Sequence, residues 1–111
     1  MITIQELFEG LAELFPEVEI YRDVIEVPEL ELLKLPYVYV TTGETQSFAA
    51  ENITYFRVTP VSLYWVEKDP DPEIERKTIE FLRDHDTPFT DEDSFDDEIG
   101  AYSHVYNFNT K

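Results

Sequence analysis

The stretch ITYFRVTPVSLYWVE, residues 53–67, gives the longest strand signal in the chain. Its apolar side chains change phase partway along: Phe56 and Val58 share one alternation phase, and Val61, Leu63 and Trp65 share the opposite one. In a strand, such a one-residue slip moves the later side chains to the other face of the sheet. The slip falls at Thr59-Pro60, and proline cannot donate a hydrogen bond to a neighbouring strand. The sequence therefore predicts a long strand with a β-bulge or a sharp bend at Thr59-Pro60.

Amphipathic helices are predicted on both sides of this strand. Residues 3–15 begin with the T-x-x-E capping box of Thr3 and Glu6 and continue with apolar side chains at helical spacing. The second helix has Asp71 as its N-cap and Pro72 at its first helical position, because the residue before a proline avoids helical backbone angles. Each helix ends before a proline. The inward face of the second helix is expected to comprise Ile74, Thr78, Phe81, Leu82 and His85.

Shorter strands are predicted near residues 18–22, 37–42 and 101–108, and the polar segments 44–52 and 91–98 are predicted to be loops. In the last strand, the alternation places four side chains on one face: Tyr102, His104, Tyr106 and Phe108. Long runs of strands with helices grouped beside them indicate an α+β fold. We expect one α+β domain over residues 1–111, with a mostly antiparallel sheet of four to five strands packed against two amphipathic helices.

The chain is strongly acidic, with 25 Asp and Glu against 8 Lys and Arg and a formal net charge of -17. Binding to nucleic acid or to an anionic membrane needs clustered basic side chains, and those of this chain are scattered: Arg22, Lys34, Arg57, Lys68, Arg76, Lys77, Arg83 and Lys111. No apolar run approaches the ~20 residues of a membrane span, and the N-terminus lacks the pattern of a signal peptide. We therefore expect a soluble protein made in a cytoplasm, which does not bind a membrane.

Catalytic and cofactor motifs are missing from the sequence. The absence of cysteine excludes disulfides and thiolate metal sites, and 3 glycines leave no room for phosphate-binding loops. The acidic run 91–98 fails as an EF-hand, because Asp96 and Tyr102 occupy the positions of the required Gly and Glu. Each of the two histidines is expected to be structural. We predict neither an enzyme nor a cofactor or metal site. We interpret the acidic run as a solvated turn, with a looser Ca²⁺ or Mg²⁺ site as the alternative interpretation.

Aromatic residues in polar surroundings suggest a protein interface instead. Tyr37 and Tyr39 alternate with valines, and Phe48 and Phe95 lie in polar segments. Tyr and Phe are enriched where proteins contact each other. Partial burial under long side chains is the alternative interpretation of the same pattern.

Two thirds of the chain, from about Pro36 onward, resembles a known family. The order of motifs is Leu35-Pro36-Tyr37-Val38-Tyr39-Val40, the segment 44–52, Val61-Ser62-Leu63-Tyr64, Lys68-Asp69-Pro70, Pro88-Phe89, and the closing Tyr102-Ser103-His104-Val105-Tyr106-Asn107-Phe108. This order resembles that of the tail-completion and head-tail joining proteins (tail terminators) in the necks of long-tailed bacteriophages and prophages. The chain departs from them in an additional Asp71-Pro72 step and in its mostly acidic surface.

The resemblance implies a tail-terminator-like α+β subunit in the virion neck or tail. Such a subunit forms a ring, typically a hexamer, binds tail-tube and head-connector proteins, and lets DNA pass through without binding it specifically. Candidate interface residues lie in the polar segment: Thr45, Gln46, Ser47, Phe48 and Asn52. Candidates for a channel-facing or solvated acidic loop are Asp91, Glu92, Asp93, Asp96, Asp97 and Glu98.

Two other functions are compatible with the same composition. A DNA mimic or antirestriction inhibitor is also small, acidic and non-enzymatic, but it needs carboxylates in two rows at the spacing of phosphates. A generic protein-interaction module in an acid-rich cell is the second alternative.

Overall fold

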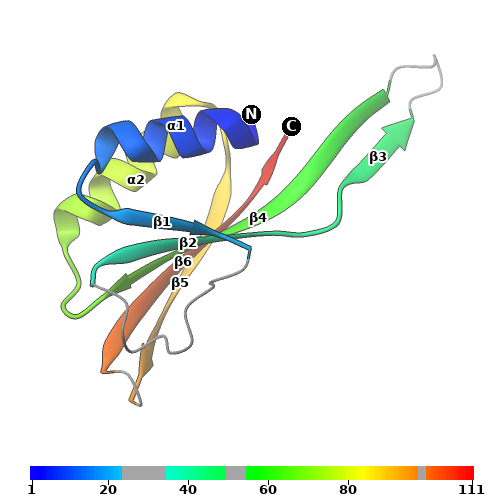
Figure 1. The fold of residues 1–111 in the computed structure, drawn as a ribbon. Helices are drawn as coiled ribbons and strands as arrows, with labels where there is room; N and C mark the ends of the chain where they lie inside the picture. The colour runs from blue at the N-terminus through cyan, green and yellow to red at the C-terminus, as the bar shows by residue number, and fades with distance from the viewer. Residues whose placement is uncertain (24–34, 50–54, 98–99) are drawn as a thin grey trace.

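The computed structural model of the chain describes residues 1–23, 35–49, 55–97 and 100–111. The elements follow in this order: α1 (Ile4–Leu14), β1 (Glu19–Arg22), β2 (Tyr37–Thr42), β3 (Gln46–Ala49), β4 (Tyr55–Glu67), α2 (Pro72–Asp84), β5 (Phe89–Asp96) and β6 (Ala101–Thr110). Both helices lie together on one side of the sheet, and β3 projects with the first part of β4 away from the rest of the molecule (Figure 1). The α+β prediction is confirmed.

The predicted N-cap residues of both helices are confirmed. The Thr3 hydroxyl accepts a hydrogen bond from the Glu6 N–H, and the Glu6 carboxylate accepts one from the Thr3 N–H. Asp71 is the N-cap of α2, where its carboxylate accepts from the Glu73 N–H and Pro72 follows. These contacts satisfy backbone donors that a helix start otherwise leaves unpaired.

The sheet is mixed, with the strand order β1-β2-β4-β6-β5. The pairs β2–β4, β4–β6 and β5–β6 are antiparallel, whereas β1 and β2 are parallel. Parallel neighbours need a long connection, and residues 23–36 supply it. The prediction of a mostly antiparallel sheet is therefore confirmed, with a parallel pair at one edge.

The prediction of a loop over residues 44–52 is wrong for its central part. Gln46–Ala49 form β3, which pairs with the first four residues of β4, from Gln46 opposite Val58 to Ala49 opposite Tyr55. The four-residue strand escaped prediction because its residues have no clear alternation. Asn52 lies outside the described residues.

The phase change in β4 coincides with a change of strand partner. On the β6 side, the pairing runs without interruption from Thr59 to Glu67. On the other side, Thr42 pairs with Val61 and Gln46 with Val58, so residues 43–45 oppose only Thr59 and Pro60. The extra residue of the expected bulge therefore belongs to the opposite segment and not to β4. The Gly43 N–H donates to the Pro60 carbonyl at 2.8 Å. Because the N and C=O of a strand residue point to the same side, the missing donor of Pro60 faces this interrupted pairing.

The acidic run is a strand, and the prediction of a solvated turn is wrong. Residues 89–96 form β5, which pairs with β6 from Phe89 opposite Phe108 to Asp96 opposite Ala101. Acids on both faces conceal the alternation that usually marks a strand. Charged side chains also protect an exposed sheet edge from pairing with other chains, and β5 is such an edge.

The main core lies between the helices and the sheet. It is made by Ile2, Leu7, Leu11, Phe15, Val38, Val40, Val61, Leu63, Trp65, Leu82, Tyr106 and Phe108. Trp65 lies at its centre, is 0% exposed, and meets Phe15 edge-on with ring centroids 4.7 Å apart. A smaller cluster covers part of the opposite face of the sheet and consists of Tyr37, Val66 and Ala101.

Candidate functional site

A pocket of about 190 Å³ opens between the first turns of α2 and the strands β4 and β6. Its apolar walls include Trp65 and Ile74. Its ionisable groups include Glu67, Glu75, His104 and Tyr106. Charged groups that converge on an apolar pocket are a common mark of a binding site.

Strand register brings the ionisable side chains of the pocket together. Trp65 and Asp93 are the two cross-strand neighbours of His104, and Asp91 is the neighbour of Tyr106. Cross-strand neighbours share one face of a sheet, so all of these side chains face the helices. Glu75, in the first turn of α2, completes the group from the other layer.

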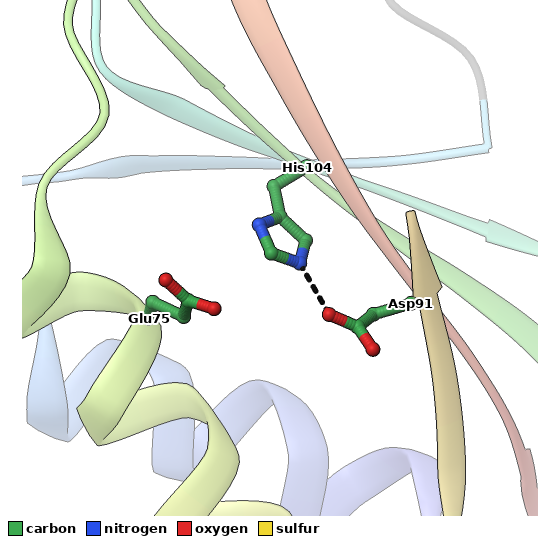
Figure 2. Close-up of side chains that lie close together, drawn as sticks. All are labelled: Glu75, Asp91 and His104. Carbon is green, nitrogen blue, oxygen red and sulfur yellow. Dashed lines mark hydrogen bonds and ion pairs between the residues drawn. The ribbon is translucent and has the colours of Figure 1, made fainter. Parts of the chain in front are cut away.

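His104 is held on both sides of its imidazole ring. Its Nε2 lies 2.9 Å from Asp91 Oδ2, and its Nδ1 lies 2.7 Å from Asp93 Oδ1. The ring stacks on Tyr106 with centroids 4.5 Å apart and planes 8° from parallel. Figure 2 shows His104, Asp91 and Glu75 converging from β6, β5 and α2. One ligand atom from each of these three residues lies within 4.8 Å of the others.

The pocket has a marked excess of negative charge. Burial raises the pKa of the Glu67 carboxyl, and the nearby Asp71 and Glu75 add to the rise, although a hydrogen bond from the Asp71 N–H opposes it. Burial, together with Glu75 and Asp91, raises the pKa of the Tyr106 phenol. Within the described residues, the arginine ion pairs lie elsewhere, at Asp23, Glu73 and Glu80.

The raised pKa of Glu67 predicts that Glu67→Gln stabilises the fold at neutral pH. A carboxyl with a raised folded-state pKa favours folding while it is protonated, and this contribution is lost as the pH rises through that pKa. We expect a rise in Tm of a few degrees at pH 7, because the amide removes a buried charge and still accepts from the Asp71 N–H. Thermal unfolding below about pH 4, where the carboxyl is neutral, should show no gain. Glu80→Gln, at an exposed position, is the control, and an unchanged or lower Tm for Glu67→Gln at pH 7 would contradict the prediction.

The two predicted sets of site residues lie in different parts of the fold. Gln46, Ser47 and Phe48 are in the projecting β3, and the Thr45 hydroxyl lies 2.8 Å from that of Thr59 at its base. In Figure 1, β3 and the β5–β6 hairpin extend in opposite directions from the sheet. An interface through β3 and a site at β5 are therefore separate features.

The acidic set divides between the two faces of β5. Asp91 and Asp93 face the helices and contact His104, whereas Glu92 and Asp96 alternate to the opposite face. Asp97 lies in the turn that follows, and Glu98 is outside the described residues. The sequence prediction missed Glu75 and His104 as partners of this set, although the expected face of His104 and Tyr106 contained the signal. The pairing of β5 with β6 was needed to connect them.

Among the described residues, neither helix is long and apolar enough to cross a membrane. In comparisons with known proteins, no family model and no curated protein matches this chain.

Proposed function

We propose that this chain is a non-enzymatic structural subunit of a phage or prophage neck or tail, which forms a ring that completes the tail tube or joins head to tail. The observation that supports this best is the projecting pair of β3 and the first part of β4, which we call the arm (residues 46–49 and 55–58). The order of sequence motifs described above supports the same assignment.

The arm makes the molecule elongated. Its extents are 51 × 29 × 23 Å and its radius of gyration is 15.2 Å, whereas a compact chain of this length is expected near 13 Å. In the described part of the arm, β3 pairs only with β4. A two-stranded hairpin without a third strand or a helix against it is marginally stable in water. Contact with a neighbouring subunit would supply the missing support.

The edges of the sheet favour the arm as the assembly contact. The edge strand β5 carries carboxylates on both faces, which oppose pairing with a second acidic chain. The sequence of β3, Gln46–Ala49, contains no ionisable residue. An arm that contacts a different surface of the next subunit makes a head-to-tail interface, and such interfaces close into rings when the rotation allows it.

The acidic surface has two consequences for such a ring. Like charges on neighbouring subunits repel, so assembly is favoured by salt, which screens them. Carboxylates on a channel wall also avoid attraction to DNA phosphates, and Glu92 and Asp96 on β5 are the candidates for such a wall. The partners on the ring faces are then the tail-tube and head-connector proteins, and DNA passes through without specific binding.

The test is the mass of the purified protein in solution, measured by light scattering at several salt concentrations. We expect a species several times the 13.1 kDa of one chain, and ring particles in negative-stain images. Phe48→Asp should leave a folded monomer, because a charge in the arm contact opposes association.

Phe95→Asp is the matched control, since Phe95 is an aromatic side chain on the acidic edge strand and is 51% exposed. It adds the same charge outside the arm and should leave the ring intact. An unchanged oligomer mass for Phe48→Asp, or loss of the ring with Phe95→Asp alone, would show that the arm is not the contact.

A further inference from the structure

We propose that Glu75, Asp91 and His104 form a binding site for a divalent transition-metal ion, with Zn²⁺ as the best fit. Glu75 and His104 line the pocket between α2 and the sheet, and Asp91 contacts His104 from β5. The site does not depend on assembly through the arm. Three observations on different groups lead to it.

The donor set is the first observation. An imidazole nitrogen with two carboxylate oxygens suits zinc and its neighbours in the first transition row, whereas Mg²⁺ and Ca²⁺ prefer oxygen alone. The three ligand atoms lie within 4.8 Å of one another, and ligands of a tetrahedral zinc ion are about 3.4 Å apart at ordinary bond lengths. Glu75 is exposed, so a small rotation of its side chain closes the difference.

The support of the histidine is the second observation. Asp93 Oδ1 lies 2.7 Å from Nδ1, where a carboxylate can accept a proton of the ring, and Nε2 faces Asp91. A carboxylate on the far nitrogen is the usual partner of a metal-binding histidine, because it sets the tautomer and the ring orientation. The stack on Tyr106 limits rotation of the same ring.

An unpaired polar atom on a residue that lines the same pocket is the third observation. The indole N–H of Trp65 is buried and has no hydrogen-bond partner among the described residues, and Trp65 lines the pocket. A buried donor without a partner is costly. A metal-bound water or another ligand oxygen in the pocket would accept this hydrogen bond. The unpaired N–H thus indicates that a ligand other than the surrounding carboxylates occupies the pocket.

Charge balance agrees with a cation at this position. Asp91, Asp93, Glu75 and the buried Glu67 surround one imidazole. A divalent ion that binds Nε2 would take the position between this nitrogen and the Asp91 carboxylate, which lie 2.9 Å apart without it. The ion compensates part of the excess negative charge and connects α2 to the β5–β6 edge.

The experiment measures thermal unfolding of the chelator-treated protein with ZnCl₂, MnCl₂, MgCl₂ or CaCl₂. At a hundredfold excess of Zn²⁺ over its Kd, we expect Tm to rise by roughly 10 °C. Asp91→Asn and Glu75→Gln should weaken Zn²⁺ binding at least tenfold by calorimetry. Asp93→Asn should also weaken it, by about 10- to 100-fold, through the loss of ring orientation.

Glu73→Gln is the matched control, because an acidic protein binds cations non-specifically. It removes the same charge from the same turn of α2, but Glu73 is paired with Arg76 outside the pocket. The second histidine, His85, is an internal control for NMR. Zn²⁺ should shift the imidazole signals of His104 and leave those of His85 unchanged. Equal loss of binding in Glu73→Gln and Glu75→Gln, no change in Tm with Zn²⁺, or no change at His104 would overturn the proposal.

Discussion

Trp65→Ala is expected to reduce the free energy of unfolding by about 3–5 kcal/mol. Domains of ordinary stability have about 5–15 kcal/mol in total, so the variant should be close to unfolding at room temperature. Trp65 is fully buried in β4 and packs edge-on against Phe15, so alanine would leave a cavity between the helices and the sheet. Urea denaturation followed by circular dichroism measures the loss, because the substitution removes the 1 tryptophan that fluorescence would report.

Trp65→Phe separates the effect of ring packing on stability from the effect of the unpaired indole N–H. It retains an aromatic ring against Phe15 and removes a buried donor that has no partner among the described residues. We expect a clearly smaller loss than for alanine. Tyr102→Ala, at a side chain that is 41% exposed, should cost about 1 kcal/mol or less. Equal losses for the three variants would mean that Trp65 is not the centre of the core.

Removal of the arm is expected to convert the proposed ring into a stable monomer. The design joins Thr45 to Thr59 through Asn-Gly in place of residues 46–58, because the two threonine hydroxyl oxygens lie 2.8 Å apart and Asn-Gly forms a tight hairpin turn. Of the arm residues whose burial is described, Gln46, Arg57 and Val58, none belongs to the main core, so Tm should change by only a few degrees. Sedimentation velocity should then give the mass of one shortened chain.

Mixing gives a second test of the head-to-tail contact. A chain without an arm can still accept the arm of a neighbour but cannot offer one, so it ends a growing ring. Increasing amounts of this chain, added before assembly, should convert wild-type rings into open fragments. If the armless chain assembles alone, or if it unfolds with the loss of the arm, the arm does not have the role proposed for it.

Local signals in the sequence predicted the helices well. The cap residues Thr3 and Asp71 were identified correctly because capping involves side chains and backbone within a few residues. The strands β2, β4 and β6 were also expected, since their β-branched and aromatic residues repeat with the period of a strand. The change of phase at Thr59-Pro60 was interpreted as a β-bulge or a sharp bend in the strand, but the extra residue is in the opposite segment.

Elements with a weak local signal were predicted incorrectly. The acids of β5 obscure any alternation, and hydrogen bonds to β6 make it a strand. β3 is short and depends on β4 for its conformation. The parallel pairing of β1 with β2 depends on a long connection, so the local sequence pattern of either strand does not indicate it.

The sequence by itself determined the α+β class, both helices with their caps, and the central strand on which the core is built. These features follow from side-chain periodicity and short-range hydrogen bonds. Only the tertiary structure decided that residues 46–49 and 55–58 form a projecting arm and that Asp91 and Glu75 meet at His104. Contacts of this kind depend on strand register and on how α2 packs against the sheet, and residues far apart in the chain do not encode them in any local pattern.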